Sequence, residues 1–139
     1  MKHDKLFSTH VYLFDNVIDN DSLLQIRKDI TSSYNQTTKN WQSKANLHRK
    51  VLYDNLTHKV VENTKNVFDN LKYEYKGFNI TDMWSNVLKP GETHRPHTHS
   101  NNILSGVFYV DAKQTSGIMF TDPRPCLLYT SDAADDEER

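Results

Sequence analysis

Two histidines separated by one residue, His97 and His99, are the side chains whose type and spacing most clearly indicate chemistry. In an extended chain, side chains at positions i and i+2 leave the same face of the backbone, so the two imidazoles can bind one metal ion. Pro96 precedes the pair and disfavours a helical conformation at Arg95, which favours the extended backbone that this geometry needs. The spacing therefore predicts half of a metal site.

A complete site needs at least one further protein ligand. Neutral imidazole binds iron, zinc, copper and nickel, and a facial triad of three protein ligands leaves positions open for substrate and cosubstrate. Asp82 and Asp122 are candidates on neighbouring predicted strands. His94 is a third candidate, although its odd separation from His97 places it on the opposite face unless the backbone turns. A bare pair of this kind also occurs among surface and packing histidines.

Two helices are predicted upstream of the histidines. A group of capping residues at 19–22 and apolar residues at spacings of three and four predict a helix over residues 22–34. Residues 31–44 are polar and are predicted to form a loop that Trp41 pins to the body. The second helix ends near residues 76–77 and carries a nearly continuous i+4 series, consisting of Leu52, Leu56, Val60, Thr64, Phe68 and Leu71.

Strands are predicted around the histidines. From residue 78 to residue 88 the pattern has a period of two, and Pro90 and Gly91 then supply turn chemistry. Residues 103–110 and 117–121 are predicted to form a hairpin. Helices followed by strands indicate an α+β fold, with N-terminal helices packed on an antiparallel sheet or barrel.

Composition limits the class of protein. The chain has 139 residues, 36% of them hydrophobic, and a formal net charge of -1, which predicts one domain without a field that attracts nucleic acid or anionic membrane. No apolar stretch approaches the roughly 18 to 20 residues that span a bilayer, and the N-terminus lacks the apolar core of a signal peptide. The single cysteine, Cys126, fits a reducing compartment, so a cytoplasmic location is expected.

The last fourteen residues differ in character from the rest. Residues 126–139 resemble one reading frame of a transposase adapter used in DNA sequencing, and an acidic disordered tail is the alternative. We therefore expect residues 1–125 to be the N-terminal part of a single domain and residues 126–139 to be a non-native tail. Under this interpretation the chain is a fragment, inactive and poorly stable, with an incomplete barrel and open strand edges.

An ordered series of short motifs runs from residue 84 to residue 124. It consists of Trp84 and Asn86; His97, His99 and Asn101; residues 105–110; and Gly117, Phe120 and residues 122–124. The series resembles a family of bacterial and phage iron(II)- and 2-oxoglutarate-dependent oxygenases. The resemblance implies a double-stranded β-helix, or jelly roll, whose mouth holds Fe(II), with 2-oxoglutarate as cosubstrate and hydroxylation as the default reaction. His97 and His99 would ligate the metal, and Asn86 and Tyr109 either bind the cosubstrate or pack in the barrel.

The chain departs from the wider superfamily in two ways. His99 occupies the position of a carboxylate ligand, which leaves more positive charge on the metal. The distal histidine and the basic residue that pairs with 2-oxoglutarate have no counterpart before Pro125. We therefore expect the fragment to lack both, and we assign no residue a catalytic role.

Two alternatives compete with an oxygenase. Gly91, His97 and His99 match the opening of the cupin motif, which next requires a glutamate where this chain has Ile103 and Leu104. A non-catalytic module, in which the histidines hold structural zinc or no metal, is the third hypothesis. The sequence indicates no nucleic-acid or membrane partner, and both small molecules and proteins remain candidate substrates.

Overall fold

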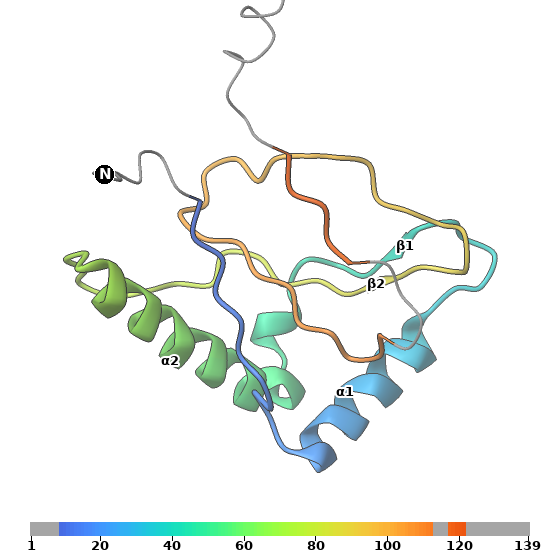
Figure 1. Ribbon diagram of the computed structural model, residues 1–139. Helices are drawn as coiled ribbons and strands as arrows, with labels where there is room; N and C mark the ends of the chain where they lie inside the picture. Colours follow the sequence, from blue (N-terminus) through green and yellow to red (C-terminus); the bar gives the residue numbers. More distant parts are fainter. Residues whose placement is uncertain (1–8, 113–116, 122–139) are drawn as a thin grey trace, which may run out of the picture. The chain divides into compact units, whose positions relative to one another are not determined.

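The computed structural model describes residues 9–112 and 117–121. The chain divides into two compact units, of which the first comprises Met1–His94 with Phe108–Asp111 and the second comprises Arg95–Val107 with Ala112–Arg139. The helices, 3₁₀ turns and strands of the described chain belong to the first unit (Figure 1). They are α1 (Asn20–Ser33), β1 (Trp41–Gln42), η1 (Leu47–Arg49), η2 (Val51–Tyr53), α2 (Asp54–Leu71) and β2 (Asn86–Val87).

Helix α1 confirms the first predicted helix. Its N-cap is Asp19, whose carboxylate accepts a hydrogen bond from the backbone N–H of Ser22 at 2.8 Å. The helix begins at Asn20, two residues before the predicted start, because the N-cap is Asp19, the first of the capping residues at 19–22. Ile26, from the predicted apolar stripe, is only 1% exposed.

Helix α2 confirms the second predicted helix, but the predicted C-terminus near residues 76–77 is wrong. The helix ends at Leu71 because Lys72 adopts a left-handed conformation with φ 57°. The backbone N–H of Tyr73 then bonds to the Phe68 carbonyl at 2.9 Å, which satisfies an end-of-helix acceptor. The two 3₁₀ turns η1 and η2 lead directly into the helix.

Strands β1 and β2 form a short antiparallel pair. Trp41 lies opposite Val87, and the Ser43 N–H extends the pairing to the Ser85 carbonyl at 3.0 Å. The predicted loop over residues 31–44 is correct for only part of its length, because α1 continues to Ser33 and β1 occupies Trp41–Gln42. The predicted strand over residues 78–88 is wrong for most of its length, because its first part packs instead on α2, where the ring centroids of Phe78 and Phe68 are 4.7 Å apart.

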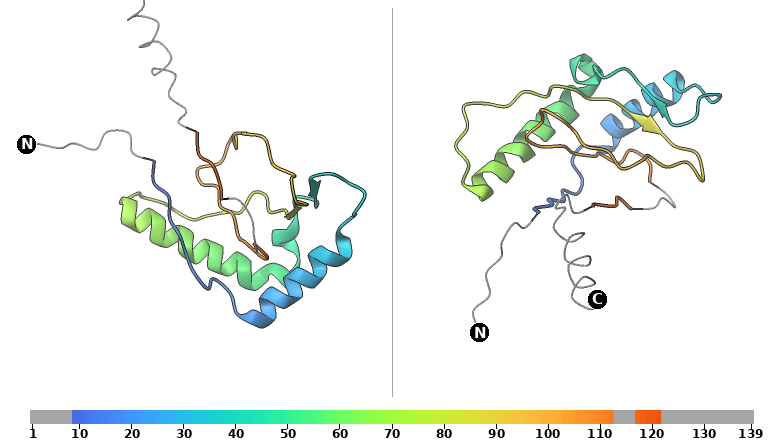
Figure 2. Two further views of the ribbon diagram at one scale, coloured as in Figure 1. Left: turned by 45° about the vertical axis from the view of Figure 1, so that its right-hand side comes forward. Right: turned by 90° about the horizontal axis from the view of Figure 1, so that it is seen from above.

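The core of the first unit lies where α1, α2 and the 3₁₀ turns meet (Figures 1 and 2). Its buried members are Ile26, Leu47, Tyr53 and Leu56. The N-terminal ends of the two helices are joined by the Asn55 amide, which donates to the Asp19 carboxylate at 2.9 Å. Partly buried apolar side chains that pack against this core are Val17, Ile18, Ile30, Leu52, Val60, Met83, Phe108 and Val110.

Residues 108–111 return to the first unit after the histidine segment. Phe108 and Val110 pack against the core, while Tyr109 between them is 50% exposed. Asp111 forms an ion pair with Arg27 of α1 at 2.6 Å. This alternation of side chains is the one expected of an extended chain, although no strand is assigned here.

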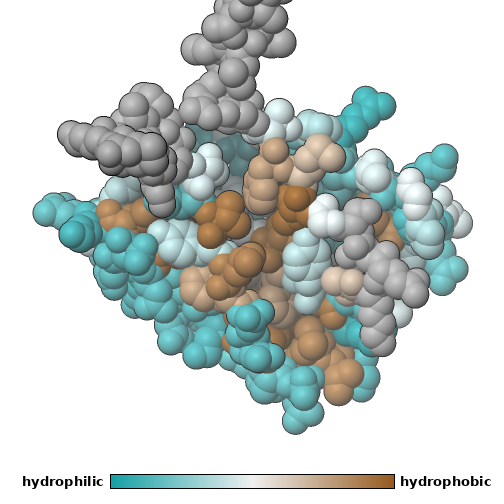
Figure 3. Space-filling view, viewed as in Figure 1, coloured by the Kyte–Doolittle hydropathy of each residue, from teal (hydrophilic) through white to brown (hydrophobic). Residues whose placement is uncertain are grey.

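The described part of the second unit has turns and irregular backbone. The predicted hairpin of residues 103–110 and 117–121 is not formed, because no strand ladder joins them, and residues 113–116 lie outside the described residues. Apolar side chains in this unit are exposed, including Ile103 at 83% and Met119 at 87%. Figure 3 colours hydrophobic residues brown and hydrophilic residues teal on one face of the molecule.

The two helices and the antiparallel strand pair fit the predicted α+β class. The described residues do not form the jelly roll that the resemblance implies, so the barrel stays a prediction. The division into residues 1–125 and 126–139 also stays a prediction, since residues 122–139 lie outside the described chain. No helix in the described part is long and apolar enough to cross a membrane.

Candidate functional site

The structure brings His97 and His99 together in the second unit. Their Nε2 atoms are 3.1 Å apart, and their ring centroids are 5.0 Å apart at an interplanar angle of 51°. Both side chains are exposed. The i, i+2 spacing therefore places two imidazole nitrogens on the same side of the backbone, as an extended chain predicts.

A backbone contact fixes the His97 ring. Its Nδ1 lies 2.8 Å from the carbonyl oxygen of Arg95, two residues earlier in the chain. Pro96 stands between them, with a backbone φ that its ring restricts. A metal-binding histidine is usually oriented by a hydrogen bond from its other ring nitrogen, and a backbone carbonyl is one of the usual acceptors.

The segment that leads to the histidines begins with a tight turn in the first unit. Gly91 has φ 84° and the Glu92 N–H bonds to the Lys89 carbonyl at 2.9 Å, the pattern of a type II turn with proline at its second position. The predicted turn at Pro90 and Gly91 is thus confirmed. The Lys89 N–H, and to a lesser extent the Asn40 N–H, bond to the Glu92 carboxylate and hold its pKa below the usual value.

The separation of the two Nε2 atoms suits a single metal ion. Two nitrogens about 2.1 Å from one ion are about 3.0 Å apart at an octahedral angle and about 3.4 Å apart at a tetrahedral angle. The observed 3.1 Å is a hydrogen-bond distance between the two rings, and it lies within about 0.3 Å of both values. Octahedral sites with two histidines, one more protein ligand and open positions are typical of non-haem iron(II).

The described residues contain no group of three or more His, Cys, Asp and Glu side chains that could hold a metal ion. Of the candidates for a third ligand, Asp82 and His94 belong to the first unit, and Asp122 lies outside the described residues. The described residues therefore supply two imidazoles, which fit iron(II) as part of its ligand shell.

Asn86 and Tyr109 are the predicted cosubstrate contacts, and both belong to the first unit. Asn86 lies in β2 opposite Gln42 and is exposed. Tyr109 is half exposed, between two residues that pack on the core. Each presents a polar group to the surface, and their assignment stays a prediction.

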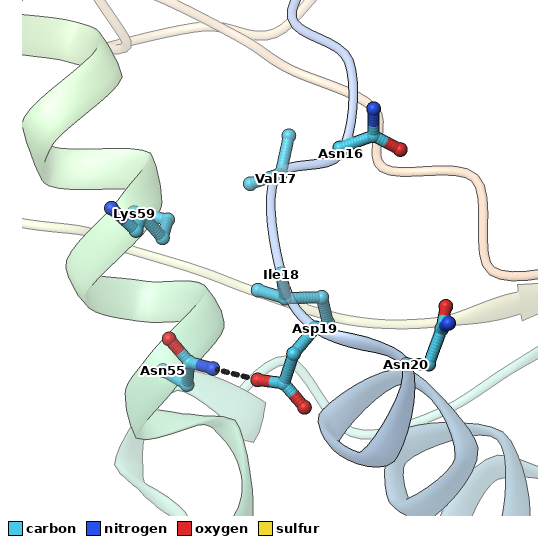
Figure 4. Close-up of a pocket in the computed structure, with 7 residues that line it drawn as sticks. All are labelled: Asn16, Val17, Ile18, Asp19, Asn20, Asn55 and Lys59. Carbon is cyan, nitrogen blue, oxygen red and sulfur yellow. Dashed lines mark hydrogen bonds between the residues drawn. The ribbon is translucent and has the colours of Figure 1, made fainter.

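Sequence reasoning did not anticipate two hollows in the first unit. One, of about 590 Å³, lies where the segment before α1 faces α2 (Figure 4), and its lining is Asn16, Val17, Ile18, Asp19, Asn20, Asn55 and Lys59. The Asp19 carboxylate there already accepts hydrogen bonds from Ser22 and Asn55, so it serves the helix cap. The only sequence signal for this hollow was the capping group itself.

The second hollow, of about 430 Å³, lies between α1 and the β1–β2 pair. Trp41, Ile30 and Leu47 supply apolar walls, and Asp29 and Lys50 form an ion pair at its margin at 3.0 Å. The sequence did not predict this hollow, because its wall includes β1, and residues 41–42 were expected to lie in a loop and not to pair with residues 86–87.

Two imidazoles with their Nε2 atoms 3.1 Å apart, one of them held by the Arg95 carbonyl, are candidates for part of a metal centre. A comparison with known protein families gives one match. Residues 82–139, which include both histidines, match the sequence model of a family described as "Putative 2OG-Fe(II) oxygenase". This part of the chain is thus similar to oxygenases that use iron(II) and 2-oxoglutarate. No curated protein and no solved structure matches the chain.

Proposed function

We propose that this protein is an iron(II)- and 2-oxoglutarate-dependent oxygenase of the hydroxylase type, with a jelly-roll barrel around its metal centre. The observation that carries the proposal is the His97–His99 pair, with its Nε2 atoms 3.1 Å apart, inside the region that matches the oxygenase family. A cytoplasmic location is part of the same proposal.

In this proposal His97 and His99 hold the iron through their Nε2 atoms. When bound, iron(II) with 2-oxoglutarate supplies the oxidation of a substrate C–H bond by O₂, with release of succinate and CO₂. The Arg95 carbonyl holds the His97 ring in place through Nδ1. Asn86 and Tyr109 donate hydrogen bonds to 2-oxoglutarate, since an amide N–H₂ and a phenolic O–H are both donors.

Metal binding is tested by anaerobic equilibrium dialysis of the full chain against iron(II). We expect His97→Ala and His99→Ala each to weaken iron binding by more than about 100-fold, because loss of even an outer-shell partner weakens metal binding about 10–100-fold. His58→Ala is the matched control, since His58 is an exposed histidine of α2 in the first unit. Equal iron binding by all four proteins would contradict the metal site.

The cosubstrate is tested on the iron-loaded protein. Addition of 2-oxoglutarate without oxygen should produce a weak visible charge-transfer band. Asn86→Ala and Tyr109→Phe should raise the 2-oxoglutarate concentration that gives half of the band, with iron binding unchanged. A folded, iron-loaded protein without the band would refute the oxygenase and favour a cupin-like or structural metal protein.

A further inference from the structure

The hydrogen bonds of the histidine pair determine which ring nitrogens carry protons in the metal-free protein. A carbonyl oxygen can only accept, so the 2.8 Å contact from His97 Nδ1 to the Arg95 oxygen requires a proton on Nδ1. A neutral imidazole carries one N–H, which leaves His97 Nε2 as an acceptor. The 3.1 Å contact between the two Nε2 atoms is then a hydrogen bond that His99 donates to His97.

This arrangement makes the two histidines unequal as metal ligands. A ring nitrogen binds a metal ion only through its lone pair, so it must carry no proton. His97 already presents a bare Nε2, whereas the His99 Nε2 holds the proton that the two rings share. Binding of one ion by both Nε2 atoms therefore requires a change at His99 and none at His97.

We propose that metal binding switches the tautomer of His99 from Nε2–H to Nδ1–H, while the Arg95 carbonyl keeps His97 in its Nδ1–H form throughout. The inference rests on the proposed metal site. The ring proton of His99 moves from one nitrogen to the other through solvent, so the neutral ring neither gains nor loses a proton. The His99 side chain is exposed, so solvent water reaches the ring.

The distances support a switch with little movement of the rings. The Nε2 atoms are already 3.1 Å apart. This is close to the roughly 3.0 Å that octahedral binding requires, so the separation of the two nitrogens changes little when an ion replaces the hydrogen bond. The Arg95 carbonyl is the positioning group, and Pro96 restricts the backbone on which that carbonyl is mounted.

The test is nuclear magnetic resonance of the full chain with ¹⁵N-labelled histidine, at constant mildly alkaline pH, without metal and then with Zn(II). Zinc is the probe because it is diamagnetic and binds imidazole. Long-range ¹H–¹⁵N correlations identify the protonated nitrogen of each ring. We expect His97 as Nδ1–H in both states, and His99 as Nε2–H without metal and Nδ1–H with zinc. Unstructured histidines favour Nε2–H, so Nδ1–H at His97 is informative.

His58 is an internal control, because its Nδ1 lies 3.2 Å from the Asp54 carbonyl of α2 and should stay Nδ1–H in both states. Pro96→Ala should lower the Nδ1–H population of His97 and weaken zinc binding about 10-fold or more, with the His58 signals unchanged. If the Pro96 variant keeps the full Nδ1–H population of His97 and the full zinc affinity, this backbone segment does not position the His97 ring.

The remaining outcomes separate the inference from the proposed function. Zinc bound by both histidines, with His99 as Nδ1–H before zinc or as Nε2–H after it, would overturn the tautomer switch and leave the metal site standing. Zinc binding that His97→Ala and His99→Ala do not weaken would refute the proposed metal site and the switch together.

Discussion

Tyr53 links the core of the first unit to a charged pair, and its replacement by phenylalanine tests that link. Tyr53 is 2% exposed and its hydroxyl donates to the Asp29 carboxylate at 2.9 Å. Lys50 binds the same carboxylate at 3.0 Å. Phenylalanine would keep the packing and remove the hydrogen bond alone.

The expected loss is worked from that single hydrogen bond. A hydrogen bond to a charged group contributes about 1.5–3 kcal/mol, and the lower end applies because Asp29 keeps Lys50 and some contact with water. Tyr53→Phe should thus lower the free energy of unfolding by about 1.5 kcal/mol, or the Tm by about 3–6 °C. Tyr73→Phe is the matched control, since Tyr73 is 55% exposed and should change stability by less than about 0.5 kcal/mol.

The same substitution has a predicted pH dependence. Burial, and then the hydrogen bond to Asp29 and its charge, raise the pKa of Tyr53 well above the usual value. The unfolded chain therefore loses this proton first, at a pH of about 10, so the stabilisation is complete below that pH and is lost as the pH rises. Above pH 10 the wild type should lose up to about 1.4 kcal/mol per pH unit relative to Tyr53→Phe.

Urea unfolding of both proteins between neutral pH and about pH 11 measures both effects. Equal stability at neutral pH, together with parallel alkaline slopes, would refute the role given to the Tyr53–Asp29 hydrogen bond. A destabilised variant with parallel slopes would refute the pKa argument alone.

Three further predictions concern the elements of the first unit. Ile26→Ala should destabilise by about 2–5 kcal/mol in urea unfolding because Ile26 is 1% exposed, whereas Leu24→Ala, at a 51% exposed site, should lose much less. Lys72→Gly should raise the Tm, by the equivalent of about 1 kcal/mol, because it relieves a left-handed residue with φ 57°, and Lys65→Gly within α2 should lower it. Hydrogen bonds from Ser22 lower the pKa of the Asp19 carboxyl. The helix cap therefore stabilises the fold fully above the usual carboxyl pKa, and this stabilisation is lost as the pH falls. Asp19→Ala should lower the Tm at neutral pH and make the Tm depend less on acid pH.

Local signals in the sequence predicted the helices and the turn before the histidines. The cap at Asp19 and the i+4 series of α2 depend on neighbouring residues only, and the structure confirms both. The end of α2 could not be read in the same way, because lysine is not the usual left-handed residue and nothing nearby marks Lys72 as one.

The strands show the opposite case. A period of two predicts that side chains alternate, but it does not say which segment supplies the hydrogen-bonding partner. Residues 78–88 alternate in type, yet the only strand among them is β2, Asn86–Val87, paired with a segment more than 40 residues earlier. Phe108 and Val110 likewise alternate with Tyr109 and pack on the core without forming a strand.

By itself, the sequence determined the two helices, the turn at Gly91 and the pairing of His97 with His99 on one side of the chain. Each follows from contacts within a few residues, where backbone geometry leaves few alternatives. Only the tertiary structure decided the pairing of β1 with β2 and the burial of Tyr53 beside Asp29. These depend on the partner that the folded chain brings to each group, and residue type and spacing do not specify that partner.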